Sequence, residues 1–193
     1  SLERNVRLLA EGMVAHLDHK ERQLAGQLSL LGEIFAREAA ALLIEDSANA
    51  IAGLIFKGVL APALLSATSI TSSASQTPLL TFTHTLLHHY LLEEVAATAT
   101  VETGHRLASI IQQQLPLFAI APIEYLDRHA TQIAFPPDTL AVLIHSLISI
   151  GLRITGTTDW SIRLQIGQVA LKLYDANSRW WNGAEFLELR LRA

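Results

Sequence analysis

The sequence predicts an α+β protein in two parts, an all-helical first half and a second half in which helices pack against a sheet. Three observations lead to this prediction. Residues 2–44 contain no proline, and their apolar residues recur every three or four positions, as on one face of a helix. An uninterrupted apolar helix pattern covers residues 138–155. Several runs in the second half alternate apolar and polar residues, which is the period of a strand. We place the boundary near Glu94, with domains over residues 1–94 and 95–193.

The first half is expected to form an antiparallel helical hairpin followed by a further helix. The first helix, residues 2–44, is amphipathic, with Glu, Arg, Lys and Gln on its polar face, and a bend is expected near Gly26 or Gly32. Residues 45–47 form the expected break, and a second helix follows to about Leu65. The Ser- and Thr-rich stretch 68–77 is the expected loop before a third helix, residues 79–94. Because such hairpins leave apolar seams exposed, we expect a dimeric helix bundle, that is, a homodimer.

The second half is expected to alternate strands and helices. The expected helices cover residues 102–117 and 138–155. The expected strands are read from alternation and from β-branched residues, and cover residues 95–101, 123–135, 160–166, 169–174 and 186–191. These elements predict an α/β layer packed on a sheet.

Composition restricts the function. The formal net charge is −4 and only 17% of residues are charged, with no basic stripe, so a nucleic-acid partner is not expected. The chain has no cysteine, which excludes disulfides, thiolate metal sites and a cysteine nucleophile. The N-terminal residues are charged and helix-periodic, unlike a signal peptide, and we expect a cytoplasmic protein.

Half of the residues are hydrophobic, which indicates a large buried interface or a membrane contact. Only residues 48–68 approach the length of a membrane span, and Lys57 and Pro62 interrupt them. We therefore expect a core or dimer-interface helix there and no membrane span.

Three short stretches of the second half carry a resemblance. Residues 146–155 read S-L-I-S-I-G-L-R-I-T, residues 174–178 read Y-D-A-N-S, and residues 182–191 read N-G-A-E-F-L-E-L-R-L. In this order they resemble the N-box helix, the D-N-G-x-G box and the closing G-G-T-x-F-x-L-x-L strand of the ATP-binding domain of sensor histidine kinases. That domain belongs to the gyrase, Hsp90, kinase and MutL superfamily. The resemblance implies a Bergerat-type α/β sandwich behind a helical dimerisation and phosphotransfer hairpin.

The departures from that pattern imply a degenerate nucleotide site. The Asn that holds Mg²⁺ in the family falls on Ile150, which offers no oxygen to a cation, and the earlier polar position falls on Ser146. Asp175 keeps the acidic residue of the second box, but two glycines have become Asn177 and Arg179. The resemblance therefore implies a chain that binds neither ATP nor another cofactor, and ATP-dependent kinase activity is not expected.

An ATP-binding domain that has lost its nucleotide-binding residues in this way is similar to that of the bacterial histidine phosphotransferases of phosphorelays. This implies docking of a response-regulator receiver domain and a phosphorylated histidine on the helical half. The candidates are His19 and His16, in H-L-D-H-K-E-R, because a carboxylate near an exposed imidazole can fix its tautomer. Neither has the acidic residue that follows the phosphoacceptor in that family. The alternative is that both histidines solvate the outer face of a long helix.

Other aromatic and histidine residues allow more than one interpretation. His84 and His88 are one helical turn apart and could bind zinc with Glu93 or His105 as a third ligand. Alternatively, a histidine of this group could be the phosphoacceptor, or the group could form a titrating cluster with His89 at a helix interface. We assign no metal.

His145 is expected to be a hydrogen-bonded core histidine. Trp160, Trp180 and Trp181 are expected either to form a docking patch or to fill the vacated nucleotide cleft.

The leading hypothesis is a dimeric two-component signalling protein, either a histidine phosphotransferase or a pseudokinase adaptor that docks a receiver domain without using ATP. The alternative is a non-enzymatic dimeric interaction or scaffold module that buries an apolar helical face. In one form of this alternative, the module assembles with a membrane partner. The third hypothesis is an active ATPase whose nucleotide-binding motifs differ from the family pattern.

Overall fold

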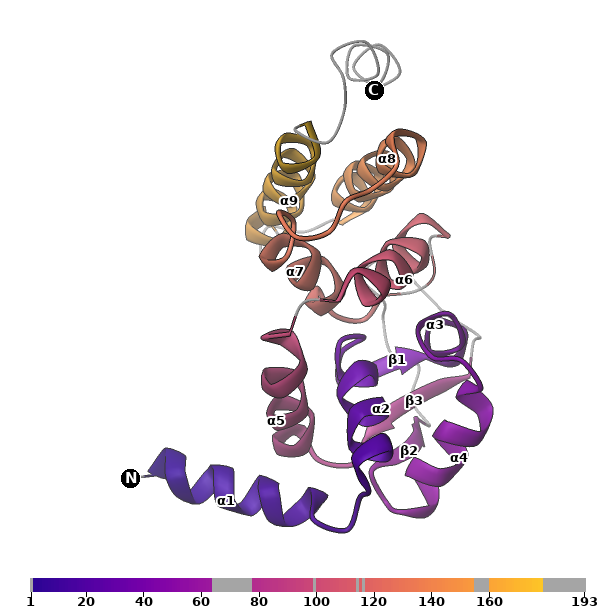
Figure 1. Ribbon diagram of the computed structural model, residues 1–193, viewed down its shortest axis with the longest axis vertical. Coiled ribbons are helices and arrows are strands. Elements are labelled where there is room, and N and C mark those ends of the chain that lie inside the picture. The colour runs from indigo at the N-terminus through magenta and orange to yellow at the C-terminus, as the bar shows by residue number, and fades with distance from the viewer. Residues whose placement is uncertain are drawn as a thin grey trace. The chain divides into compact units, whose positions relative to one another are not determined.

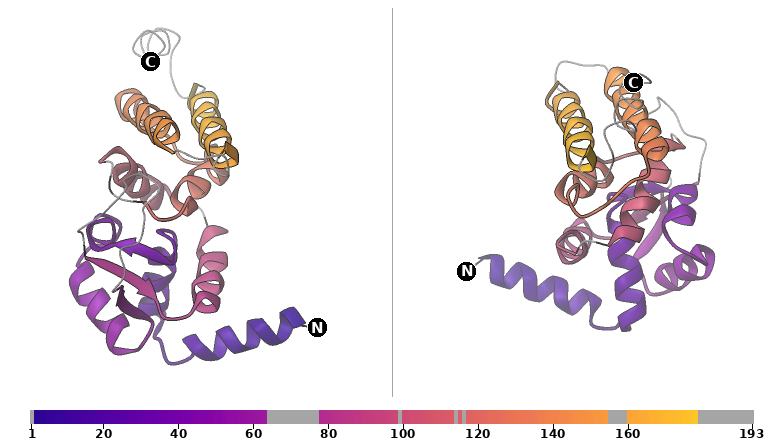
Figure 2. Two further views of the ribbon diagram at one scale, coloured as in Figure 1. Left: turned by 180° about the vertical axis from the view of Figure 1, so that it is seen from behind. Right: turned by 45° about the horizontal axis from the view of Figure 1, so that its top comes forward.

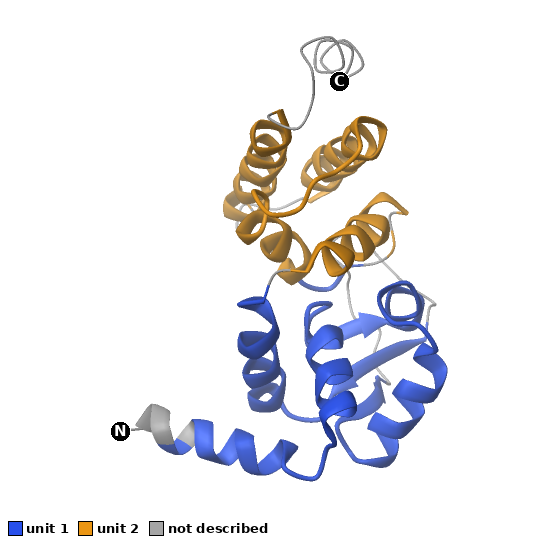
Figure 3. Ribbon diagram, in the orientation of Figure 1, with its two compact units in different colours: residues 1–98, 116–119 blue, residues 99–115, 120–193 orange. Residues whose placement is uncertain are grey.

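The computed structural model describes residues 2–63, 78–98, 100–113, 115, 117–154 and 160–178. The protein is α+β, and its described part is mostly helical with a small three-stranded antiparallel sheet. It divides into two compact units (Figure 3), one formed by Ser1–Thr98 with Pro116–Ala119 and the other by Ala99–Leu115 with Ile120–Ala193. The boundary that we placed near Glu94 falls inside the last helix of the first unit.

The first unit wraps helices around the sheet (Figure 1). Its elements are α1 (Leu2–Val14), α2 (His19–Ser29), β1 (Ile34–Ala36), α3 (Arg37–Leu43), α4 (Ser47–Phe56), β2 (Leu60–Ala63), β3 (Leu79–Phe82) and α5 (Thr85–Ala96). The strand order is β1-β3-β2, and the central strand β3 pairs antiparallel with both neighbours, with Phe35 opposite Leu80 and Ala61 opposite Thr81. Pro62 lies in the edge strand β2, where a residue without an N–H is tolerated.

The single long helix expected over residues 2–44 is wrong, because the chain breaks twice. The first break precedes α2, where Asp18 forms a capping box: its carboxylate accepts a hydrogen bond from the Glu21 N–H at 2.8 Å, and the Glu21 carboxylate accepts one from the Asp18 N–H at 2.9 Å. The second break is at Gly32, whose φ of 104° favours glycine. A Cβ at Gly32 would lie 2.6 Å from the Cβ of Ala119, so the turn also needs the missing side chain.

The expectation of an all-helical first half is also wrong, because the sheet lies there. The second expected helix ends at Phe56, and Gly58, with φ of 72°, turns the chain into β2. The third expected helix begins as β3, and α5 starts only at Thr85. These strands have three or four residues each, which is too short to show a strand period in the sequence.

Helices α3 and α4 form a helix-turn-helix. Their axes are bent by 118° at a short break in which Asp46 has a φ of 53°. Strands β2 and β3 follow directly as an antiparallel pair. Within the described ranges, no helix taken alone has both the length and the apolarity to cross a membrane, and only the bent α3–α4 pair passes that test by composition.

The second unit contains α6 (Val101–Gln112), α7 (Ala121–Arg128), α8 (Pro137–Arg153) and α9 (Trp160–Ser178). The helices form two stacked pairs: α6 packs on α7 and α8 on α9, while α6 also contacts α8 and α7 contacts α9. Figures 1 and 2 show α8 and α9 side by side, with α6 and α7 on one side of the pair. This is how helix pairs stack in α-solenoids.

The two helices expected in the second half are confirmed as α6 and α8, whereas its expected strands that fall on described residues are wrong. Residues 95–101 contain the end of α5 and the start of α6, residues 123–135 begin inside α7, and residues 160–174 form part of one helix, α9. The expected strand over residues 186–191 lies outside the described residues. The described part of residues 95–193 thus contains helices where the resemblance implied most of a sheet.

Candidate interaction surface

Helix α8 occupies the position of the resembling N-box, and its inner face is filled with protein. Pro137 opens the helix, where a missing N–H costs nothing, and Asp138 adds a favourable charge to the first turn. Ser146, Leu147 and Ile150 are all buried. The described side chains therefore leave no open nucleotide cleft along this face of α8.

The other two degenerate positions lie on α9 and point to different environments. Asn177 is fully buried: its Nδ2 donates to the Leu173 carbonyl at 2.9 Å, and its Oδ1 accepts from the Phe135 N–H at 2.8 Å. Asp175 is exposed on the helix surface. Asn177 is therefore a structural residue, and Asp175 does not follow a strand as the resemblance implied.

An exposed apolar surface lies on the outer side of α8 and α9, away from their buried stripes. We call this surface the α8–α9 face, and it consists of Val142, His145, Ile148, Leu152, Trp160, Leu164 and Leu171. Its residues are spaced three or four apart along α8 and four or seven apart along α9, so each helix presents one stripe. Leu152 is 75% exposed, Leu171 67% and Trp160 66%.

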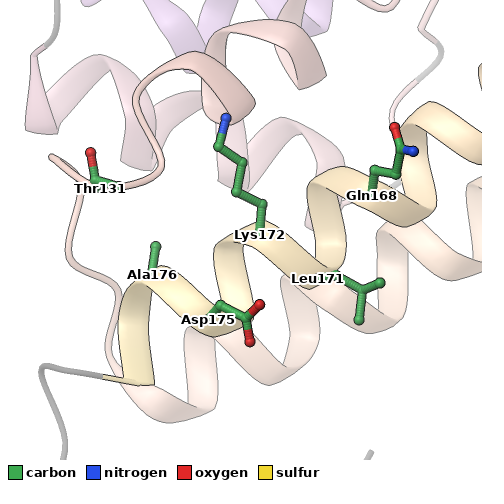
Figure 4. A pocket seen from close by; sticks show the side chains of 6 residues that line it. All are labelled: Thr131, Gln168, Leu171, Lys172, Asp175 and Ala176. Carbon is green, nitrogen blue, oxygen red and sulfur yellow. The ribbon is translucent and has the colours of Figure 1, made fainter.

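A shallow hollow of about 530 Å³ lies beside this face, lined by Thr131, Gln168, Leu171, Lys172, Asp175 and Ala176. In Figure 4, Leu171 and Asp175 project from α9 away from Lys172, whose ammonium pairs with Asp127 of α7 at 2.9 Å. The only charged groups of the hollow thus diverge. This geometry suits a surface contact rather than a converging catalytic site.

His16 and His19 lie on either side of a break, not on one long helix as expected. His16 is in the turn after α1, and its Nε2–H donates to the Lys57 carbonyl at 3.2 Å. His19 is the first residue of α2 and is exposed. The nearby carboxylates are engaged elsewhere, because Asp18 and Glu21 bond to each other's backbone and the Lys57 ammonium donates to Glu21.

The Lys57 ammonium and the Asp18 N–H hold the pKa of Glu21 below its usual value. Both hydrogen bonds favour the charged form of the carboxyl, and together they outweigh burial, which acts in the opposite direction. The hydrogen bonds among Asp18, Glu21 and Lys57 thus connect the turn before α2 to the end of α4.

His88 is buried between α5 and α2, and its Nε2–H donates to the Ser29 carbonyl at 3.0 Å. Its Nδ1 is buried without a hydrogen-bond partner among the described residues. Burial lowers the pKa of His88, and the neighbouring His89 acts in the same direction. The expected location at a helix interface is confirmed for His88, whereas His84 and His89 are exposed.

The remaining histidines are separated from this group. His105 belongs to the second unit, where its Nε2–H donates to the Ala134 carbonyl at 2.9 Å and its ring stacks on Phe135. His145 is exposed, so the expected core histidine is wrong. No set of three His, Asp or Glu side chains within the described ranges is placed to hold a metal ion.

The helix-turn-helix has the wrong electrostatics for DNA. Its second helix α4, the one that would enter the major groove, contains no Lys or Arg, and Glu45 and Asp46 stand at its N-terminal end. Lys57, at its C-terminal end, pairs with Glu21. The N-terminal end of such a helix usually contacts base edges. In α4 this end is acidic and would repel the DNA phosphates.

The sequence contains a signal for the α8–α9 face. Helix α8 is apolar nearly all round, with Leu140 and Leu143 facing inward and Val142 and Ile148 facing outward. One face of a helix can be buried in its own unit, so the second apolar stripe needs another explanation. Trp160 joins this exposed surface, whereas Trp180 and Trp181 lie outside the described residues.

Fold and surface together define a mostly helical α+β protein with an exposed apolar helix pair. Comparison with known protein families, with curated proteins and with solved structures finds no match.

Proposed function

We propose that this chain is a non-enzymatic protein-interaction module whose binding surface is the α8–α9 face. One observation carries the proposal. Six large apolar side chains, at helical spacing on two adjacent helices, remain 48% to 75% exposed. Large exposed apolar surface on a folded protein typically marks an interaction site, and the two stripes supply such surface.

Two other features of the described chain support binding over catalysis. Ser146 and Ile150 are packed inside the second unit, which leaves α8 without a nucleotide-binding face. The charged groups around Lys172 diverge, and the helix-turn-helix presents acidic residues where DNA contacts would form. Among the described residues, the exposed apolar side chains of the α8–α9 face are therefore the surface best suited to bind a partner.

A photo-crosslinking amino acid placed at Leu171 tests the proposal directly. In cells that produce the chain, we expect a discrete protein adduct from position 171, because the side chain would lie within the interface. The matched control is position 56, because Phe56 is 90% exposed on α4, in the other unit. Equal adducts from both positions, or no adduct from position 171, would overturn the proposal.

A second candidate is a two-component signalling protein, a histidine phosphotransferase or pseudokinase adaptor that docks a response-regulator receiver domain without using ATP. The observation in its favour is the exposure of His19 in the first turn of α2. A degenerate Bergerat-type sandwich belongs to this candidate. Among its described parts, α6 and α8 match the expected helices, whereas α7 and α9 occupy ranges expected as strands.

Incubation with a phosphorylated receiver domain tests this candidate. The phosphoryl group would leave the receiver's aspartate as a P–O bond breaks and would form a P–N bond with the imidazole. Mass spectrometry under conditions that preserve phosphohistidine should then find the label on His19, and His19→Ala should remove it while His16→Ala should not. A chain without label in every sample would end the transferase role.

A further inference from the structure

We infer that the partner of the α8–α9 face is a second copy of the same face, related by a two-fold axis that sets the helices of the two copies antiparallel. This inference rests on the proposed function, because it names the occupant of the same surface.

The first support is the stacking already present in the second unit. There, α8 and α9 lie on α6 and α7 as one helix pair on another. The α8–α9 face offers a second apolar layer on the opposite side of the same pair. A helix pair that is apolar on both sides can bury its outer stripe when another pair stacks on it. A second copy supplies such a pair with matching spacing.

The second support is the distribution of charge along the face. Helices α8 and α9 run antiparallel, since Phe135, just before α8, bonds to Asn177 near the end of α9, while a Cβ at Gly151 would lie 3.8 Å from Ile166. Asp138 and Asp175 therefore mark one end of the helix pair, and Arg153 and Arg163 mark the other. The face has an acidic end and a basic end.

This polarity selects the orientation of the second copy. A two-fold axis perpendicular to the helices places the acidic end of each copy over the basic end of the other. Stacking in the same direction would instead place carboxylates over carboxylates, which costs free energy. The two-fold arrangement also repeats every contact twice, so each favourable charge pair occurs on both sides.

Arg163 and Asp175 are the charges most suited to this contact. The Arg163 residue is half-buried near the start of α9, at the basic end of the helix pair. The Asp175 side chain forms no hydrogen bond or ion pair with any described residue. In the two-fold arrangement, the Asp175 carboxylate of each copy would pair with the Arg163 guanidinium of the other.

The size of the face approaches that of a standard dimer interface. Helices α8 and α9 contain 17 and 19 residues. Two adjacent helices about 25 Å long and about 20 Å wide together present on the order of 500 Å² in projection. Their accessible surface is larger than this projection, and a standard interface buries about 800 Å² per partner.

Sedimentation velocity over a range of concentrations tests the identity of the partner. We expect the wild-type chain to form a dimer, Ile148→Glu with Leu171→Glu to remain monomeric, and Phe56→Glu to dimerise like the wild type. All three positions are solvent-exposed, and circular dichroism checks that each variant is folded. A wild-type chain that stays monomeric, or a double variant that still dimerises, would overturn the inference.

Charge reversal tests the orientation. Asp175→Arg and Arg163→Glu should each raise the dimer dissociation constant about tenfold, and the two together should restore it. Failure of the double reversal to restore the dimer would overturn the two-fold arrangement.

The two proposals can fail separately. A monomeric wild type that still gives an adduct with a different protein from position 171 overturns the second copy as partner and leaves the interaction module standing. A monomeric wild type without any adduct overturns both.

Discussion

The buried side chain of Asn177 accepts a hydrogen bond from the backbone N–H of Phe135, and the two atoms are 2.8 Å apart. This bond fastens the segment before α8 to the end of α9. The Asn177→Leu substitution would leave that buried N–H without an acceptor, so we expect the free energy of unfolding to fall by about 1–3 kcal/mol. Urea denaturation measures the change. Ser178→Ala is the control, since its hydroxyl bonds only within its own helical turn, to the Asp175 carbonyl.

His88 makes the stability of the first unit depend on pH. Burial lowers its pKa in the folded state, so the unfolded chain, with the ordinary histidine value of 6.5, binds a proton more readily. The contribution of His88 is therefore complete above pH 6.5 and is lost as pH falls through the lowered folded value.

Unfolding measured across this pH range should show a flatter profile for His88→Leu than for the wild type. His84→Leu is the matched control: His84 is exposed and is not among the groups that shift the pKa of His88, so this variant should keep the wild-type slope. A wild-type slope in His88→Leu would show that this ring does not govern the pH dependence.

The hydrogen bond from Lys57 to Glu21 predicts a change in a measurable pKa. It lowers the pKa of Glu21 from 4.5, so the stabilisation that it provides is present above pH 4.5 and is lost as pH falls through the folded value. In Lys57→Met the pKa of Glu21 should rise. NMR titration of the carboxyl group measures this rise. Lys20→Met is the control, because Lys20 is exposed on the same helix as Glu21, and it should leave the pKa of Glu21 at its wild-type value.

The acidic N-terminal end of α4 predicts that the helix-turn-helix does not bind DNA. Glu45 and Asp46 would repel phosphates, and α4 itself supplies no cation. Fluorescence anisotropy with duplex DNA at low salt should show no saturable binding. Binding that weakens steeply with added salt would contradict this account of the helix-turn-helix.

Helix α8 could be predicted from the sequence because its signals agree. Two prolines and Asp138 mark its start, and its apolar pattern is long enough to exclude a strand. The break before α2 was also readable, because Asp18 followed three residues later by Glu21 is a capping-box pattern.

The misassigned part of α9 has a physical cause that bears on function. Trp160, Ile162, Leu164 and Ile166 alternate like a strand, yet they lie on a helix with apolar residues both inside, at Ile166, and outside, at Leu164. Two apolar stripes on one helix imitate alternation. The residues that misled the prediction therefore include those of the α8–α9 face.

The sheet of the first unit could not be predicted by periodicity. Strand β1 has three residues, and its partner β3 lies more than 40 residues further along the chain, with Phe35 opposite Leu80. Such short, buried strands become ordered through pairing and packing with distant residues, which a local pattern does not contain.

Hydroxyl-radical footprinting at increasing protein concentration measures most directly whether the α8–α9 face is an interface between copies. The account predicts that the labelling rate of Leu171 and Trp160 falls as the dimer forms, while that of Phe56, outside the face, stays constant. Constant labelling of Leu171 across a concentration range in which the chain associates would contradict it, because another surface would then form the contact.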